Sequence, residues 1–366
     1  TPAVKRTGVI AGDFVFFGNQ NDVFAPGPGF DEDQAVQDAY NDGRNSFQEP
    51  LTFDFVAAAG GDISYGYFTV GAEGGPPVVN VPLFASAATA FLAAGKNCLV
   101  DDADDDSCDR ERAFTYERYL AVGDGDVASV LSEIYKVRGT KTGTVRGHVL
   151  ASATGEGSPN AQVFVFLDPA PDKPWASIDE LVNANLDASD EVGMYSSIDA
   201  DLGLDLLEDG DFEAELPPGS YVLVARDAAG TVVSAPEKVT IEAGRVTQLS
   251  PTLPPPARIN YRVTDDAGLE LPAKLALISL DDGGVPLEGD GKRRPYLGDG
   301  RLGNGKRLIS VTATGEGTFQ VEPGRYRLRV SRGPEYDLHE EADFVLGSGD
   351  VKNVNAILHR EVDTSG

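Results

Sequence analysis

Short runs of alternating apolar and polar residues, separated by turns rich in glycine and proline, recur through residues 143–360. The two clearest runs each have one apolar face, formed by Tyr221, Leu223 and Ala225 in the first and by Tyr326, Leu328 and Val330 in the second. A period of two is that of a strand with one buried face. A Pro-Gly pair, which favours a tight turn, precedes each run. The pattern predicts antiparallel strands with one core face and one solvent face.

The runs follow the same order in residues 143–254 and 257–360, which indicates a diverged tandem repeat. Each copy has the turn spacing of a small antiparallel β-sandwich. The proline-rich linker at residues 251–256 favours an extended, semi-rigid spacer between them. We therefore expect a first sandwich at 143–254, a second at 257–362, and in residues 363–366 the start of a linker to any downstream domain.

Residues 1–140 lack the repeat and indicate a separate, mainly β, sandwich-like domain with a few short helices. Its strand-like runs lie at residues 12–17, 51–57, 65–70 and 89–94. Asp31 can cap a helix that ends at Tyr40, and Asp126 can cap a helix over residues 127–137 with one apolar stripe.

A third helix is expected at residues 177–186, where Ser177 and Glu180 have the spacing of a capping box. It lies in a helical insertion at residues 168–208 of the first sandwich. The predicted fold class is thus mainly β: tandem antiparallel β-sandwiches of the immunoglobulin-like or transthyretin-like kind, after an N-terminal mainly β domain.

The composition changes the picture of partners. The 366 residues include 59 acidic and 30 basic side chains, a net charge of −29 that lies almost wholly in the first 256 residues. Such a charge repels nucleic acid and anionic lipid, so these partners are disfavoured, and calcium or a basic surface is more plausible. No apolar run approaches the roughly 20 residues of a membrane helix, so no membrane span is predicted.

The two cysteines, Cys98 and Cys108, enclose nine residues, which suits a disulfide-closed loop in an oxidising compartment; two reduced, buried thiols are the alternative. The chain begins at Thr1, as a mature or trimmed product would. We expect an exported protein, located in the periplasm, on the cell surface or outside the cell.

Candidate chemistry is sparse. The three histidines, His148, His339 and His359, lie on or beside different predicted strands, and no GxSxG nucleophile motif occurs. Residues 298–303 match GxGxxG formally, but residues 308–313 after them are strand-like, so no helix N-terminus is available for phosphate. We predict no catalytic site and no organic cofactor, although an acid pair could hide among the many carboxylates.

Calcium is the one ligand that the acidic runs favour, because this ion takes six to eight oxygen ligands. One candidate group lies between the cysteines and comprises Asp101, Asp102, Asp104, Asp105 and Asp106. The other lies in the insertion and comprises Asp199, Asp201, Asp205, Asp209 and Asp211. Neither has EF-hand spacing, so a solvated acidic loop is the alternative for each.

Arg325, Arg327 and Arg329 share the outward face of one predicted strand, and a nearby loop holds Lys292, Arg293 and Arg294. A solvated strand face is one interpretation. The other is a docking surface for an acidic neighbour: another domain, a downstream catalytic part or a second copy of the chain.

The first copy, with GTVRGHVL, AQVFVFL and DGDFEAELPPGSYVLVARDAAG, resembles the carboxypeptidase-regulatory-like, transthyretin-like sandwich of bacterial surface proteins. The stretch SRGPEYDLHEEADFVLGSGDVKNVNAILHREVDTSG resembles the segment before the catalytic domain in exported PHP-type metallohydrolases of the CehA/McbA group. Residues 12–22 and 116–127 are similar to the front of such proteins. None of that group's metal ligands has a matching position here.

This resemblance implies a non-catalytic accessory or interaction region that precedes a PHP-like metal-dependent hydrolase domain. The alternative is a self-associating structural or adhesive surface subunit that calcium could stiffen. The partner is a protein in both cases: a downstream domain in the first, and a second copy or another protein in the alternative.

Overall fold

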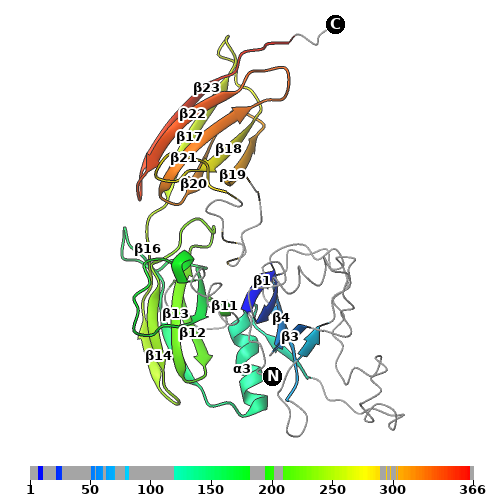
Figure 1. Ribbon diagram of the computed structural model, residues 1–366, viewed down its shortest axis with the longest axis vertical. Coiled ribbons are helices and arrows are strands. Elements are labelled where there is room, and N and C mark those ends of the chain that lie inside the picture. Colours follow the sequence, from blue (N-terminus) through cyan, green and yellow to red (C-terminus); the bar gives the residue numbers. More distant parts are fainter. Residues whose placement is uncertain are drawn as a thin grey trace, which may run out of the picture.

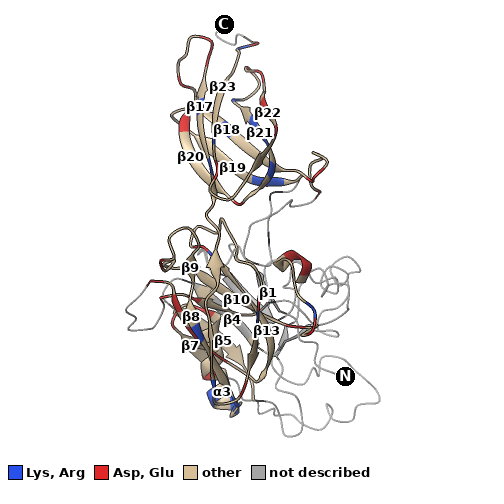
Figure 2. Cartoon of the chain, turned by 90° about the vertical axis from the view of Figure 1, so that its left-hand side faces the viewer, with Lys and Arg blue, Asp and Glu red and all other residues tan. Residues whose placement is uncertain are grey.

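The structure is a computed structural model. It describes residues 7–10, 22–26, 51–53, 55–60, 63–70, 79–81, 119–181, 194–201, 209–288, 294, 297, 302 and 304–362. The described chain is mainly β, as predicted. Two β-sandwiches lie end to end, with a smaller β region beside the first (Figure 1). The view turned by 90° shows the same end-to-end arrangement (Figure 2).

Sandwich 1 has a four-stranded and a three-stranded sheet. The larger sheet has the order β11 (Met194–Asp199), β10 (Gln162–Leu167), β13 (Gly219–Arg226), β14 (Glu237–Ile241). The smaller has the order β12 (Asp211–Leu216), β8 (Gly143–His148), β15 (Val246–Leu249). The short strands β9 (Leu150–Ala151) and β16 (Thr252–Leu253) continue beside it. Only the pairs β8–β15 and β9–β16 are parallel among the described strands of this sandwich.

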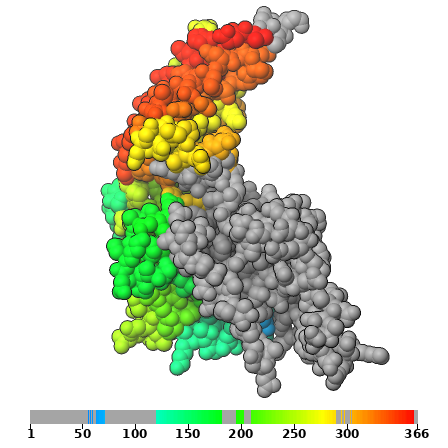
Figure 3. Space-filling model, viewed as in Figure 1, coloured from blue at the N-terminus to red at the C-terminus, as the bar shows by residue number. Residues whose placement is uncertain are grey.

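Sandwich 2 repeats the two main sheets of this topology, without a counterpart of β9 and β16 among its described strands. Its larger sheet has the order β19 (Lys306–Thr312), β18 (Ala273–Ser279), β21 (Gly324–Ser331), β22 (His339–Leu346). Its smaller sheet has the order β20 (Glu316–Val321), β17 (Ala257–Thr264), β23 (Val351–Ile357), with β17 and β23 parallel. The space-filling view shows it as a separate lobe (Figure 3). The tandem pair that the repeat predicted is present.

A buried tyrosine marks the same corner in both sandwiches. The hydroxyl of Tyr221 donates to the carbonyl of Pro217 (2.9 Å), and that of Tyr326 donates to the carbonyl of Glu322 (2.8 Å). Each tyrosine comes two residues after the glycine of the Pro-Gly turn, so its ring fills the core while its hydroxyl satisfies a carbonyl before the turn.

The predicted alternation is confirmed in one copy and wrong in the other. In β21 the odd-numbered positions 325, 327 and 329 are outward and partly or fully exposed, while Tyr326, Leu328 and Val330 are buried. In β13 both faces are buried, because Val222 and Val224 pack into a second hydrophobic cluster. The outer face of β13 meets protein, not solvent.

The N-terminal region provides that second cluster. Its main sheet has the order β1 (Thr7–Ile10), β2 (Asp22–Pro26), β4 (Phe55–Gly60), β5 (Ile63–Phe68), β7 (Tyr119–Gly123), and β3 (Leu51–Phe53) pairs with β6 (Val79–Val81). Helix α3 (Val127–Arg138) packs on β5 and β7 on one side and on β11 and β12 on the other. The cluster therefore crosses the predicted boundary near residue 140.

Local sequence explains where α3 begins, ends and lies. Asp126 caps it as predicted: its side chain accepts from the N–H of Ser129 (2.8 Å), and its other oxygen accepts from that of Asp199 in β11 (3.1 Å). Gly139 ends it with φ 65°. Gly66 lets the helix approach β5, since an added Cβ would overlap Val130. The predicted strands at 12–17 and 89–94 and the helix at 31–40 lie outside the described residues.

Candidate interaction site at the junction of the two sandwiches

The arginines of β21 have carboxylate partners within their own sheet. Arg327 Nη2 donates to Asp343 (3.1 Å) and Arg329 Nε donates to Glu340 (2.6 Å), both on the neighbouring strand β22. Arg325 lies 3.9 Å from the same Asp343. An acidic docking partner would therefore compete with β22, and the docking surface stays a prediction.

Asp201 is the centre of the described part of the second acidic group. One carboxylate oxygen accepts from the N–H groups of Gly210 (2.7 Å) and Asp211 (3.2 Å), and the other from that of Asn160 (2.8 Å). Asp201 itself has φ 66°, a conformation that aspartate tolerates better than most residues. This carboxylate holds Asn160 and the start of β12 through backbone donors.

The described residues contain no group of three or more His, Cys, Asp or Glu that could hold a metal ion. Asp199 accepts from Gln162 Nε2 (3.2 Å) instead of joining Asp201. Asp205 and the whole group of Asp101, Asp102, Asp104, Asp105 and Asp106 lie outside the described residues, as do Cys98 and Cys108. Calcium binding and the disulfide therefore stay predictions.

The three histidines lie apart, as their sequence positions indicated. Each has a carboxylate beside it: His148 with Asp211, His339 with Glu341 and His359 with Asp266. All three imidazoles are partly exposed. Ion pairs at such positions contribute little to stability, and these pairs do not form one site.

Polar and apolar contacts join the two sandwiches at their junction, and the first component of this junction is the linker. β16 pairs with β9, and Leu253 lies in the core of sandwich 1. Two residues further on, the carbonyl of Pro255 accepts from the N–H of Gly349 (3.1 Å) and from Ser348 Oγ (3.0 Å) in sandwich 2. The proline segment is therefore held on both sides.

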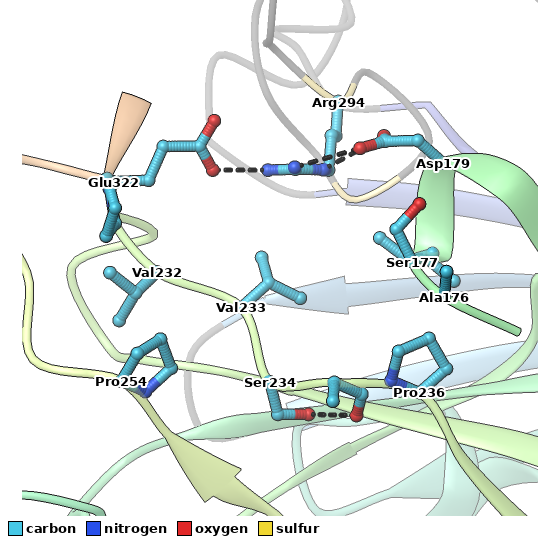
Figure 4. Close-up of a pocket in the computed structure, with 13 residues that line it drawn as sticks. Ala176, Ser177, Asp179, Val232, Val233, Ser234, Pro236, Pro254, Arg294 and Glu322 are labelled. Carbon is cyan, nitrogen blue, oxygen red and sulfur yellow. Dashed lines mark hydrogen bonds and ion pairs between the residues drawn. The ribbon is translucent and has the colours of Figure 1, made fainter. Parts of the chain in front are cut away.

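Arg294, from the β18–β19 connection of sandwich 2, is the second component. Its Nε and Nη2 donate to the two oxygens of Asp179 in sandwich 1 (3.1 and 3.0 Å), and its Nη1 donates to Glu322 in sandwich 2 (2.7 Å; Figure 4). The side chains of Arg294 and Glu322 are 13% and 9% exposed, while that of Asp179 is 49% exposed. Arg307 Nε lies 3.9 Å from the other oxygen of Glu322. Such bidentate, charge-assisted bonds are stronger than neutral ones.

Leu297 is a second contact from the same connection. Its side chain is 2% exposed within the cluster that holds Phe164, Phe166 and Val224. Its carbonyl accepts from Nη1 of Arg226, the last residue of β13. The β18–β19 connection of sandwich 2 thus contacts sandwich 1 at an ionic point and at an apolar point.

The insertion of sandwich 1 positions Asp179 by a capping box. Residues 178–181 are helical, and Ser177 Oγ accepts from the N–H of Glu180 (3.1 Å). Glu180 Oε2 in turn accepts from the N–H of Ala176 (2.9 Å), one residue before the expected partner. The carboxylate of Asp179 therefore projects from the first turn of a capped helix.

The single tryptophan anchors the same insertion. Asp168, with a side chain 1% exposed, accepts from Trp175 Nε1 (3.0 Å) and forms an ion pair with Lys238 (2.9 Å). Lys238 also donates to the carbonyls of Ala170 (2.7 Å) and Pro171 (2.9 Å). These bonds satisfy the buried carboxylate, which would otherwise be costly.

A cavity of about 340 Å³ opens between these elements (Figure 4). Val232, Val233 and Pro254 line one side, and Arg294 with its two carboxylates lines the other. Its described lining includes no histidine or cysteine, and the ionic groups are already paired with one another. The arrangement suits packing and contact between domains.

Sequence reasoning named Arg294 in a basic loop with an acidic neighbouring domain as one candidate partner, and the structure supplies Asp179. It did not identify Asp179, Glu322 or Trp175 as junction residues. The available signals were the position of Asp179 in the capping box and that of Glu322 directly before the Pro-Gly turn.

No protein-family model and no curated protein matches the chain. Among solved structures, a streptococcal ancillary pilin is similar with 15% identity over 61% of this chain and a TM-score of 0.30; the match spans 64% of that pilin. The minor pilin of Streptococcus agalactiae matches with 12% identity over 60% of this chain and 97% of its own, at 0.33.

The shaft pilin SpaA of Lactobacillus rhamnosus GG matches with 12% identity over 61% of this chain and 99% of its own, at a TM-score of 0.28. These scores and identities are too low to transfer any property to this chain. The resemblance of residues 331–366 to PHP-type proteins remains untested. No helix in the described residues is long and apolar enough to cross a membrane.

Proposed function

We propose that this chain is a structural or adhesive subunit of a cell surface, in which two β-sandwiches form a stiff spacer. The observation that carries the proposal is the junction. The paired linker connects the sandwiches, and a second segment, the β18–β19 connection, adds the Arg294 bridge and the buried Leu297. Two domains that move freely about a hinge would share few such contacts.

The distribution of polar groups supports the same function. The described ionic groups at the junction are paired with one another, as in a structural contact, and the repeated sandwiches add length without adding a new kind of site. The high net negative charge keeps such a subunit soluble at high local concentration. The proposed partner at the surface is another protein or a second copy of this chain. The proposal also requires that the protein is exported.

Small-angle scattering of the full chain tests the stiffness, and surface proteolysis of intact source cells tests the location. A single extended conformation together with protease-accessible protein on cells is the expected result. A scattering curve that needs a broad range of inter-sandwich angles would overturn the stiff spacer. Protein found only inside intact cells would overturn the surface role.

An accessory role before a metal-dependent hydrolase domain is the second candidate, and it rests on the resemblance of residues 331–366. The chain leaves sandwich 2 at the end that lies far from sandwich 1 (Figure 1). A further domain attached there would lie away from sandwich 1. Intact mass of the native protein with peptide mapping separates the two: a His-rich continuation favours the accessory role, and its absence excludes that role.

A further inference from the structure

The first and last strands of each sandwich are parallel neighbours. In sandwich 2, β17 pairs with β23 from Arg258↔Val351 to Thr264↔Ile357. In sandwich 1, β8 pairs with β15 from Thr144↔Val246 to Gly147↔Leu249, and β9 with β16 extends the contact. We call each such parallel contact a terminal seam.

Hydrogen bonds close both ends of each seam. In sandwich 2 the N–H of Arg258 donates to Asp350 (2.8 Å), and that of Leu358 donates to Thr264 (2.9 Å). In sandwich 1 the N–H of Thr144 donates to the carbonyl of Arg245 (2.8 Å), and the N–H of Ser152 donates to that of Leu253 (2.9 Å). Each seam is therefore hydrogen-bonded both where the chain enters the sandwich and where it leaves.

Parallel pairing decides how tension acts. The chain enters sandwich 2 at the start of β17 and leaves it at the end of β23, and in a parallel pair these points lie at opposite ends. Tension between the chain ends therefore slides the strands past each other along their length. The hydrogen bonds lie across that direction, so the whole row must yield together. A pair that is pulled apart from one end opens bond by bond.

We propose that the terminal seams make this chain a tension-bearing element that transmits pulling force between its two ends. Its biological role rests on the proposed function, since a surface subunit with an attached partner is stretched along the chain. The mechanical property itself belongs to the fold. The unfolding rate under load, and not the equilibrium stability, is what such a seam controls.

The first test compares two pulling directions on the full chain in single-molecule force spectroscopy. In one direction the handles are attached at both chain ends. In the other, one handle is at the C-terminal end and one at exposed Ala313, which precedes β20. Because Glu316 pairs with Arg262, Ala313 and the end of β23 lie at the same end of the smaller sheet. We expect sandwich 2 to unfold at several times higher force with end handles. Equal forces would overturn the proposal.

The second test removes one seam bond. Leu358 donates to β17 and the carbonyl of Asp350 accepts from it. Because donors alternate sides along a strand, Lys352 also donates to β17, whereas exposed Asn355 donates toward the free edge. Lys352→Pro should lower the end-to-end unfolding force, while Asn355→Pro should leave it unchanged. Lys352→Ala controls for the lost ion pair with Glu341.

The outcomes separate this inference from the proposed function. If the unfolding force depends on the pulling direction but the protein is found only inside cells, the mechanical role of the seam stands and the surface role is refuted. If the protein is on the surface but the unfolding force is equal in both pulling directions, the proposed function stands and the role of the seam is refuted. The same conclusion follows if the two proline variants lose unfolding force equally. Circular dichroism of each variant confirms that it is folded before it is pulled.

Discussion

Arg294→Ala is the sharpest perturbation of the junction. It leaves Glu322, with a side chain 9% exposed, without its 2.7 Å charged hydrogen bond, while Asp179 is 49% exposed and regains water. A hydrogen bond to a charged group contributes about 1.5–3 kcal/mol, and a solvent-exposed ion pair much less. Arg307 stays near Glu322 and offsets part of the loss. Because Glu322 lines the junction cavity, opening the junction would hydrate its unpaired carboxylate, so we expect the junction to weaken by about 2 kcal/mol.

Native-state hydrogen exchange measures this loss locally. The N–H of Gly349 bonds to Pro255 and that of Ser152 bonds to Leu253, so both report on opening at the linker. A change of about 2 kcal/mol corresponds to about 30-fold faster exchange when opening limits the rate. The core strands of each sandwich should exchange as before, because neither sandwich core includes Arg294.

Arg245→Ala is the matched control, since its ion pair with Glu242 has side chains 75% and 62% exposed. Exposed pairs of this kind contribute about 0–1 kcal/mol, so exchange at the linker should not change. If Arg294→Ala accelerates exchange at Gly349 no more than Arg245→Ala does, the ionic bridge does not hold the sandwiches together. The linker pairing and Leu297 would then carry the junction alone.

Three further predictions concern single elements. Tyr221→Phe and Tyr326→Phe should each lower the free energy of unfolding by about 1 kcal/mol in urea titrations, because each orphans a carbonyl; an unchanged midpoint would contradict the corner bond. Burial raises the pKa of Asp126 above 3.8. Its contribution to stability is thus complete below the unfolded pKa and is lost as pH rises through the folded pKa. Thermal melting from about pH 3.5 to about pH 7 should show this loss in the native chain but not in Asp126→Asn; parallel profiles would refute it. Gly66→Ala should cost about 1–3 kcal/mol through overlap with Val130, as measured by melting, and an unchanged melting temperature would show that α3 can shift.

The sequence predicted the elements whose signals are local. A cap residue acts within one helical turn, so Asp126 and Ser177 located the starts of two helices. Alternation with a Pro-Gly turn located β21 and the repeat that contains it. These features depend on neighbours in the chain, which is why one sequence is enough to find them.

The junction could not be predicted because its partners are distant in sequence. Arg294 and Asp179 are 115 residues apart, and nothing in either segment specifies the other. The basic loop indicated only that some acidic neighbour was plausible. The role of Asp201 could not be predicted for a related reason: it accepts from backbone N–H groups that composition does not reveal.

The outer face of β13 shows how one fold takes two roles in the same chain. Val222 and Val224 occupy positions where sandwich 2 has Arg327 and Arg329, since both pairs follow the same corner tyrosine. Each buried valine contributes roughly 1.5–3 kcal/mol by leaving water, which favours a covering layer, and α3 with the N-terminal sheet provides it. A charged guanidinium would have to leave water to be covered, so the same face of sandwich 2 stays open and pairs with β22. Two positions in β13 and β21 therefore distinguish the sheet face that another layer covers from the sheet face whose arginines stay partly exposed.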